Sequence, residues 1–275
     1  MSGPHLSVVV PTRDNARTIA ACLASVRDTT TVPFELLVVD NASSDGTPAI
    51  AERAGARVIA AGPERSAQRN EGLHQATGDV VAFLDSDMVA TEGLLDEATA
   101  LIADGHQAVI LSEASIGVGY WARVRRLERS CYLGDDAIEA ARVFSRRTLN
   151  DVGGFDEALS AFEDWDLTAR VRAAGARVAR TTRIVLHDEG RLTFRSAVSR
   201  KAGYGAWLEA YRARHPELAA RQLSPLRRLA AYAAHAPLLA RAPLATAGLV
   251  VLKAAEAAAA ATAARRGAGE ADPNS

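Results

Sequence analysis

The chain has 275 residues, of which 48% are hydrophobic and 24% are charged, a composition typical of a globular protein with a sizeable core. Its formal net charge is −1, but residues 1–190 hold 19 basic and 28 acidic residues, whereas residues 191–275 hold 13 and 5. An acidic body without an aromatic-basic pattern argues against binding to nucleic acid. The basic C-terminal part predicts contact with something anionic, such as a membrane surface or phosphate groups.

Cysteine usage and the N-terminus both favour a cytoplasmic protein. Cys22 and Cys131 are the two cysteines, and their separation matches neither a metal site nor a disulfide framework. We therefore expect a reducing compartment. The apolar run Leu6–Val10 is too short for a secretory signal and is followed by Pro11, so no signal peptide is expected.

Strands alternate with helices in the first part of the chain. Apolar runs predict strands at residues 6–10, 34–39, 56–60, 80–84 and 108–111. Helical spacing of apolar residues, proline at a helix start and capping residues predict helices around 19–26, from 48, at 66–76 and at 92–103. This alternation predicts an α/β fold, with a mostly parallel sheet and helices on both faces.

Two carboxylates end the most apolar of these strands. Asp85 and Asp87 follow the run Val80–Leu84 and flank Ser86. In an extended segment residues i and i+2 point to the same side, so we expect the two side chains to converge. Mg²⁺ is usually held by one or two carboxylates plus substrate phosphates, and open α/β sheets bind ligands at the carboxyl ends of strands. The alternative is a turn with solvated acids, because Asp-x-Asp is a common pattern.

The chain is less regular after residue 112 and becomes purely helical after Thr193. A helix is predicted at 121–133, an antiparallel strand at 140–145, a helix at 162–174 and extended segments at 177–180 and 184–186. Further helices are predicted at 194–214, 225–239 and 244–265. We therefore expect an α/β domain, a basic helical extension and a disordered end, at residues 1–190, 191–266 and 267–275.

The last of these helices is long enough to reach across a bilayer. Residues 242–264 nevertheless contain Lys253 and Glu256 and consist largely of weakly apolar alanine. With arginines nearby, an interfacial helix or a helical hairpin against the body is preferred to a spanning helix.

Six short motifs occur in a specific order and spacing, although each is weak alone. They are Val8–Thr12, Val38–Thr47, Arg69–Gly72, Phe83–Asp87, Gly153–Asp156 and Glu163–Leu167. In these motifs the sequence resembles the family 2 glycosyltransferases, inverting enzymes with the Rossmann-like GT-A fold, from residue 6 to about residue 190. The resemblance implies a nucleotide-diphosphate-sugar donor. A UDP-sugar is favoured over a GDP- or dTDP-sugar, and the expected acceptor is a hydroxyl of a saccharide or lipid-linked glycan in cell-surface polysaccharide synthesis.

The resemblance places the nucleotide against the ends of the first two strands. Asp40 matches an aspartate that accepts a hydrogen bond from a ring N–H of the base, with helix capping as its alternative role. Pro11 and Thr12 would form the adjoining wall. Arg13 stands where many relatives carry an aromatic residue, so either a ring or a guanidinium would stack on the base.

Further donor and metal residues follow from the same resemblance. Arg69 matches an arginine near the nucleotide and is alternatively a structural ion-pair partner; Asp85 and Ser86 would also contact the donor. Asp87 would ligate Mg²⁺ or Mn²⁺, Asp85 would contact the ribose or metal-bound water, and His187 would complete the coordination. The metal would offset charge that develops on the leaving nucleoside diphosphate. The alternative oxygen ligands are Asp188 and Glu189.

Asp164 matches the base that takes a proton from the acceptor hydroxyl. It opens a predicted helix, where an acid is also expected for capping, but capping does not explain three acids in four positions. Asp166 and Glu163 are the alternative bases. Glu163 and Trp165 would face the acceptor or the sugar.

Two other enzyme classes and one binding role compete with this interpretation. A polyprenyl-phosphate glycosyltransferase fits the basic C-terminal helices, but a phosphate acceptor needs little deprotonation. A sugar nucleotidyltransferase needs a glycine-rich loop after the first strand, which residues 11–15 lack. A non-catalytic nucleotide-sugar-binding module would be expected to have lost Asp85, Asp87 or Asp164. The basic helices also predict peripheral attachment to the cytoplasmic face of the membrane.

Overall fold

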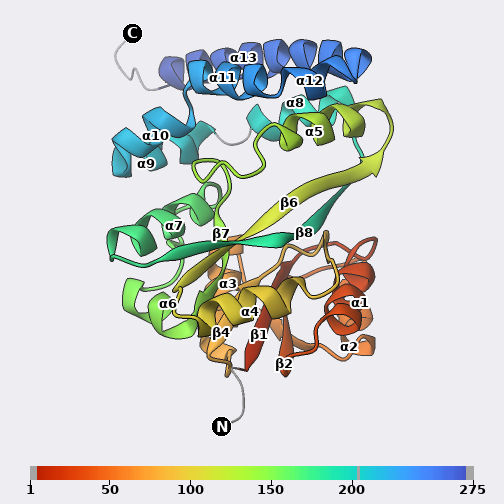
Figure 1. Ribbon diagram of the computed structural model, residues 1–275, viewed down its shortest axis with the longest axis vertical. Helices are drawn as coiled ribbons and strands as arrows, with labels where there is room; N and C mark the ends of the chain where they lie inside the picture. The colour runs from red at the N-terminus through yellow and green to blue at the C-terminus, as the bar shows by residue number, and fades with distance from the viewer. Residues whose placement is uncertain (1–4, 203–204, 271–275) are drawn as a thin grey trace. The chain divides into compact units, whose positions relative to one another are not determined.

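The computed structural model describes residues 5–202 and 205–270 (Figure 1). Its contacts divide the chain into two compact units, which are described separately. The first unit holds the chain up to Ala114 and Gly134–Asp188; the second holds Ser115–Leu133 and the chain from Glu189. Residues 115–133 thus group with the C-terminal helices. The predicted boundaries at residues 190 and 266 stay a prediction.

Within the described residues, eight strands form one sheet in the order β3-β2-β1-β4-β7-β6-β8-β5. Parallel pairs join β1 to β2 and β4, and β2 to β3, whereas β7 is antiparallel to β4 and β6, and β5 is antiparallel to β8. The strands are β1 Leu6–Thr12, β2 Phe34–Asp40, β3 Arg57–Ala60, β4 Val80–Phe83, β5 Met88–Ala90, β6 Ala108–Val118, β7 Ala141–Ser145 and β8 Val178–Arg191.

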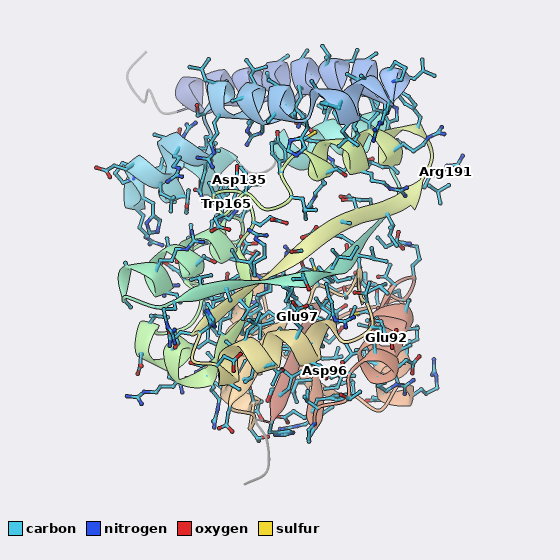
Figure 2. The ribbon with its side chains drawn as sticks, in the orientation of Figure 1. Glu92, Asp96, Glu97, Asp135, Trp165 and Arg191 are labelled. Carbon is cyan, nitrogen blue, oxygen red and sulfur yellow. The ribbon has the colours of Figure 1, made fainter. Side chains whose placement is uncertain are left out.

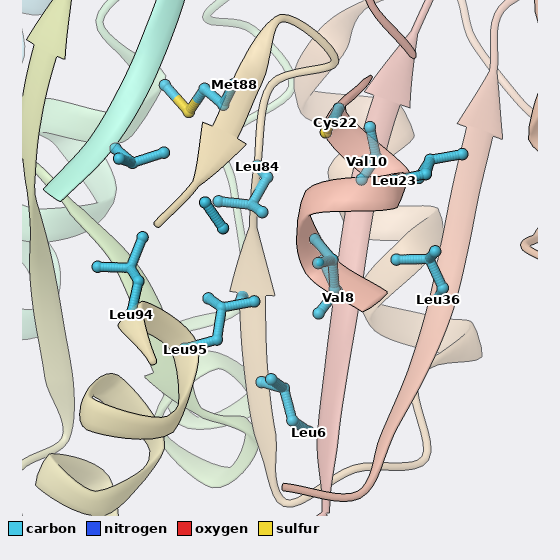
Figure 3. Packing of buried hydrophobic residues seen from close by; sticks show 14 of the residues in the cluster. Leu6, Val8, Val10, Cys22, Leu23, Leu36, Leu84, Met88, Leu94 and Leu95 are labelled. Atoms are coloured by element: carbon cyan, nitrogen blue, oxygen red, sulfur yellow. The ribbon is translucent and has the colours of Figure 1, made fainter. Parts of the chain in front are cut away.

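Alternate residues of the central strands supply two hydrophobic clusters on opposite faces of the sheet. Leu6, Val8 and Val10 of β1 belong to one cluster (Figure 3), whereas Val9 belongs to the other. Helices α1, α2 and α4 contribute to the first cluster, and α3, α6 and α7 to the second. Because successive side chains of a strand point to opposite faces, the continuous apolar runs require this cover on both sides. The predicted α/β fold is confirmed.

The helices of this unit alternate with the strands as predicted. Helix α3 lies so close to β1 that a Cβ at Gly72 would come within 2.2 Å of Val9. Helix α4 is tied to neighbouring backbone through its acids (Figure 2): Asp96 accepts from the N–H groups of Thr31 and Val32, and Glu97 from those of Thr182 and Arg183. The helices are α1 Ile19–Thr29, α2 Thr47–Arg53, α3 Arg65–Gln75, α4 Leu94–Ala103, α6 Arg146–Val152 and α7 Glu163–Ala173.

The second unit consists of helices packed around a small core of its own. Leu249 and Leu252 of α13 pack with Val124 of α5 and Ala197 of α8. A Cβ at Gly248 would meet the Tyr120 hydroxyl at 2.2 Å, so glycine permits the close approach of α13 to α5. The helices are α5 Tyr120–Ser130, α8 Phe194–Ala202, α9 Gly205–Arg214, α10 Pro216–Gln222, α11 Pro225–Ala234, α12 Ala236–Ala240 and α13 Pro243–Glu270.

Several helix boundaries differ from the prediction. The stretch predicted as one helix at 225–239 is broken at His235 into α11 and α12, because Pro237 in the first turn of α12 cannot continue a preceding helix. The stretch predicted at 194–214 contains α8 and α9, and residues 203–204 of that stretch lie outside the described residues.

The end of the chain was predicted to be disordered from residue 267. Helix α13 runs to Glu270 and so includes the first residues of that predicted end, while the boundary at residue 266 stays a prediction. The rest of that predicted end, residues 271–275, lies outside the described residues. Among the described helices, none is both long and apolar enough to cross a membrane.

Candidate functional site

The ends of β1 and β2 lie side by side at one edge of the sheet. Thr12 is the register partner of Asp40, and the Gln68 side chain donates hydrogen bonds to the carbonyl oxygens of Thr12 (2.9 Å) and Val39 (2.6 Å). The Asp40 carboxylate is buried and accepts from the backbone N–H (2.9 Å) and hydroxyl (2.5 Å) of Ser43. Each carboxylate oxygen has two lone pairs, so Asp40 keeps capacity for a further donor.

The segment after β4 is a turn and not an extended strand. β4 ends at Phe83, and the Met88 N–H donates to the Asp85 carbonyl oxygen (2.9 Å). The predicted extended geometry of residues 85–87 is therefore wrong, whereas the meeting of Asp85 and Asp87 at one site stays a prediction. Their carboxylates have different partners, and Ser86 between them is 5% exposed.

Arg69 joins the turn after β4 to the start of α7. Its Nη2 donates to Asp85 Oδ1 and its Nη1 to Glu163 Oε1, both at 2.8 Å. The side chain is 1% exposed, and its guanidinium carbon lies 5.1 Å from the centre of the Phe155 ring. Asn70 next to it exchanges two hydrogen bonds with the Phe155 backbone, which fixes the Gly-Gly-Phe-Asp turn against α3.

A second arginine, Arg142 of β7, continues the chain of charges from Asp85. Its Nη1 lies 3.3 Å from Asp85 Oδ2 and its Nη2 lies 3.9 Å from Glu113 Oε2. Glu113 Oε1 lies 2.8 Å from His187 Nδ1, and His187 Nε2 lies 3.2 Å from Asp87 Oδ2. Alternating charges thus run without a gap from Glu163 through Arg69 to Asp87.

These contacts shift the pKa values of the groups. Burial by itself would raise the pKa of Asp85, but Arg142 and Arg69 hold it well below its usual value. Burial lowers the pKa of His187, yet its hydrogen bonds to Asp87 and Glu113 outweigh burial and raise the pKa to about 10. In this arrangement Asp85 is therefore ionised and His187 is protonated at neutral pH.

Asp87 and His187 form a donor set that suits a divalent cation. Their facing atoms are 3.2 Å apart, close to the ~3 Å that separates neighbouring ligands of an octahedral ion with bonds of ~2.1 Å. Glu113 holds the far nitrogen of the ring, as carboxylates behind metal-bound histidines do. Since a metal-bound histidine is neutral, an ion would replace the proton between the two side chains.

The two residues come together because β5 pairs antiparallel with β8, with Met88 opposite His187. Among the described residues no group of three His, Cys, Asp or Glu side chains is placed to hold a metal. Direct coordination of a metal ion by Asp85 stays a prediction. Because Arg69 and Arg142 already pair with its carboxylate, a position next to the ion, without a bond to it, is favoured.

The three acids at the start of α7 have different surroundings. Glu163 is 4% exposed and paired with Arg69, while Asp166 is 0% exposed and paired with Arg170 at 2.8 Å. Burial raises the pKa of Glu163, and the Asp164 carboxylate adds to this against the opposing effect of Arg69. Asp164 is half-buried, and in the described part of the chain its one recorded side-chain contact is with the N–H of Trp165 (2.9 Å).

The remaining predicted residues lie in several surroundings. Trp165 packs on Phe162 at 5.4 Å between ring centres, and its Nε1 donates to the Ile138 carbonyl oxygen. Pro11 is buried in β1, whereas the Arg13 side chain is 64% exposed.

The two alternative oxygen ligands are already partnered. Asp188 Oδ2 accepts from Arg17 Nη1 at 2.6 Å, and the Asp188 N–H donates to the Asp87 carbonyl oxygen. Glu189 belongs to the second unit, where it lies 4.0 Å from Arg129. Neither therefore replaces His187 as the nearest partner of Asp87.

Three residues that connect the site were not predicted: Gln68, Glu113 and Arg142. Arg142 sits between apolar neighbours in a predicted strand, and Glu113 follows another. A charged residue in such a strand is almost never buried without a partner, so this signal marks Arg142, whereas Glu113 lies beyond the predicted strand and carries no such signal. The signal does not name the partners.

Residues 7–154, more than half of the chain, match the model of the family described as Glycosyl transferase family 2. The chain belongs to glycosyl transferase family 2. The match includes the ends of β1, β2 and β4 and the whole of α3, and it stops before the acids of α7. The expected family membership is confirmed.

Two relatives with known names are consistent with membership of family 2. The chain is 31% identical over 247 residues to the pre-mycofactocin glycosyltransferase of Mycobacterium tuberculosis (strain ATCC 25618 / H37Rv), a match that covers 78% of this chain and 50% of that protein. It is 31% identical over 206 residues to the succinoglycan biosynthesis protein ExoO of Rhizobium meliloti (strain 1021), covering 64% and 58%. The chain thus spans about half the length of the curated relatives it matches.

Solved structures share the fold of this family 2 chain. The mannosyltransferase PcManGT from Pyrobaculum calidifontis, in complex with GDP-Man and Mn²⁺, has a TM-score of 0.64 at 20% identity and covers 98% of this chain and 88% of its own. Glucosyl-3-phosphoglycerate synthase from Mycobacterium tuberculosis, with Mn²⁺, UDP and glucosyl-3-phosphoglycerate, has a TM-score of 0.53 at 23% identity and covers 72% and 77%. The expected GT-A fold is confirmed.

Proposed function

We propose that the chain is an inverting glycosyltransferase that moves a sugar from a nucleotide-diphosphate donor to a hydroxyl acceptor. The observation that carries this proposal is the different surroundings of the acids at the site. Asp85 and Glu163 form ion pairs with Arg69, whereas the Asp87 carboxylate lies next to His187. Asp164 is the one acid of the α7 start for which no ion pair is recorded within the described residues.

The donor is held by the ends of β1 and β2 and by the turn after β4. Asp40 accepts a hydrogen bond from a ring N–H of the base, beside the wall formed by Pro11 and Thr12. A UDP-sugar is the first candidate. A GDP-sugar is the second candidate, because a solved structure of similar fold contains GDP-Man.

Asp87 and His187 are the residues that would hold Mg²⁺ or Mn²⁺, with the diphosphate as a further ligand. When bound, the ion offsets the charge of the leaving nucleoside diphosphate. The paired arginines keep Asp85 ionised beside this position.

Asp164 acts as the general base. The acceptor oxygen forms a bond to the anomeric carbon, the bond to the diphosphate oxygen breaks, and the acceptor proton passes to the Asp164 carboxylate. Attack opposite the leaving group inverts the anomeric centre. Arg69 keeps Glu163 in place, so that the first turn of α7 presents Asp164 instead of its neighbour.

A saccharide or lipid-linked glycan at the cytoplasmic face of the membrane is the proposed acceptor. This assignment rests on the basic C-terminal part of the sequence. The curated relatives include a protein of succinoglycan biosynthesis, which is consistent with a polysaccharide product.

Thermal unfolding with nucleoside diphosphates tests the proposal. A ligand that binds only the folded state raises stability by RT ln(1 + [L]/Kd). We expect UDP or GDP to raise Tm with Mn²⁺ present and ADP to have little effect, and we expect release of the nucleoside diphosphate from the matching sugar donor. If no nucleoside diphosphate changes Tm with or without Mn²⁺, the chain is not a nucleotide-sugar enzyme.

A further inference from the structure

Among the side chains that the structure describes, helices α11, α12 and α13 of the second unit expose only apolar residues. Leu239 and Ala245 pack into the same small core, and the Thr246 hydroxyl donates to the Leu239 carbonyl oxygen, so α12 and α13 lie against each other. We call the following exposed residues the apolar face: Pro225, Leu226, Leu229, Ala230, Ala233, Ala234, Ala236, Pro237, Ala240, Pro243, Leu244, Ala247, Val250, Val251, Ala254, Ala257 and Ala258.

This arrangement inverts the usual pattern of a surface helix, which exposes polar residues and buries apolar ones. The two charged residues in the described part of α13, Lys253 and Glu256, are turned inward instead. Glu256 is 6% exposed and is paired with Arg125 at 3.1 Å and with Lys253 at 2.6 Å, and Lys253 also reaches Glu128. Large side chains stand on the outside: Leu226 is 77% exposed, Leu244 is 78% exposed and Val250 is 67% exposed. Large apolar side chains gathered on the exposed sides of packed helices mark a site that is covered by a partner.

Positive charge accompanies the apolar face. Between Glu217 and Glu256 the sequence contains no acidic residue, while it contains Arg221, Arg227, Arg228 and Arg241. Arg241 is exposed in the short link between α12 and α13. Because Glu256 is buried and paired, the surroundings of the apolar face carry positive charge without exposed negative charge over this stretch.

This charge pattern helps to decide which partner covers the apolar face: a second copy of the chain, another protein or a lipid surface. A second copy of the chain on the same face would bring two sets of arginines together, because a twofold contact pairs a patch with itself. A protein partner is typically anchored by aromatic side chains, and no exposed position of the described parts of α11–α13 is aromatic. Anionic lipid offers both an apolar interior for leucine and valine and negative headgroups for arginine.

We propose that the apolar face docks on the surface of an anionic lipid bilayer, with the exposed Arg241 at the level of the headgroups. The inference rests on the proposed function only in giving this contact a purpose, which is to hold the enzyme beside a lipid-linked acceptor. The binding itself involves neither donor nor metal.

Vesicle sedimentation of the full chain tests this docking. The vesicles consist of phosphatidylglycerol and phosphatidylcholine in equal parts, with pure phosphatidylcholine for comparison. We expect the chain to sediment with the anionic vesicles at low salt and less so at high salt, since salt screens exposed charges. The double variant Leu226→Ser/Leu229→Ser should lower the partition coefficient by about tenfold or more, because each leucine loses apolar burial. Arg241→Glu should weaken binding to the anionic vesicles and leave binding to the pure phosphatidylcholine vesicles unchanged.

Val118→Ser is the matched control. Val118 is 69% exposed, belongs to the same unit and lies at the end of β6, outside α11–α13. It should sediment like the unchanged chain, and circular dichroism should show that all variants are folded.

Two results would overturn the docking proposal. One is a full chain that stays in the supernatant with anionic vesicles at low salt. The other is a dimer in analytical ultracentrifugation that Leu226→Ser/Leu229→Ser dissociates, which would make the face an interface between copies. Nucleoside diphosphate binding is measured separately, so failure of the proposed function would leave the sedimentation result unchanged.

Discussion

Replacing Arg69 by methionine removes the link between the turn after β4 and the start of α7. Methionine has a similar length and no charge, so the change leaves Asp85 and Glu163 buried without this partner. Each is paired to Arg69 at 2.8 Å, and Arg69 is 1% exposed, so little water is available to compensate.

The magnitude follows from these contacts. Removing one partner of a buried ion pair costs about 3–5 kcal/mol, because the other charge stays buried. The cation–π contact with Phe155 adds roughly 0.5–1 kcal/mol. Arg142 still compensates Asp85, so we take about 4 kcal/mol for the sum. For a domain of this size each kcal/mol lowers Tm by about 2–4 °C, so we expect a fall in Tm of ~10 °C.

The pH dependence gives the prediction a sign. The folded-state pKa of Asp85 is depressed, so its stabilising effect is complete above the unfolded-state pKa of about 3.9 and is lost as pH falls through the folded-state pKa. In Arg69→Met this pKa is less depressed. Glu163 also loses Arg69, and because burial already raises its pKa, its part of the difference is lost first as pH falls. The difference in Tm between the two proteins should therefore be largest at neutral pH, and the part due to Asp85 should be lost below about 4.

Thermal unfolding followed by circular dichroism at neutral and acidic pH measures both effects. Arg147→Met is the control, because Arg147 is 91% exposed and its pair with Asp151 is 3.8 Å long, so its Tm should stay close to that of the unchanged chain. If Arg69→Met unfolds within a degree or two of the control, or if the difference is the same at all pH values, the buried bridge does not contribute as argued.

Three further predictions concern the reaction and its metal. Asp164→Asn should keep donor binding and lower transfer by ~10²–10⁴-fold in a turnover assay; near-normal turnover would instead favour a phosphate acceptor, which needs no base. Asp87→Ala should abolish transfer and the Mn²⁺-dependent part of the Tm shift with nucleoside diphosphate while the chain stays folded, and full turnover in excess EDTA would contradict a metal-dependent reaction. Glu113→Gln should weaken Mn²⁺ binding by ~10–100-fold in titration calorimetry, because Glu113 orients His187; unchanged affinity would show that His187 is not a ligand.

Local patterns in the sequence were sufficient for most elements of the first unit. β1, β2 and β4 were predicted because continuous apolar runs of this length suit strands covered on both faces. The carboxyl ends of parallel strands meet at one edge of a sheet, and so the neighbourhood of Thr12 and Asp40 could also be expected. These conclusions need only the periodicity of side chains and the rules of sheet connection.

The partners of the charged residues could not be predicted in the same way. Asp85 and Asp87 are two residues apart, yet a turn separates their carboxylates, one toward Arg69 and Arg142 and the other toward His187. Glu113, which holds the far ring nitrogen of His187, comes from β6 and is distant from His187 in the sequence.

The amino-acid sequence by itself determined the strands and helices of the sheet, the acids available to the site and the basic, alanine-rich character of the C-terminal helices. Only the tertiary structure decided that Asp164 stands apart from the ion pairs of Glu163 and Asp166, and that α13 turns Glu256 inward and its apolar side outward. The physical reason is that periodicity is local, whereas a buried charge takes its partner from whichever distant segment the packing brings within hydrogen-bonding distance.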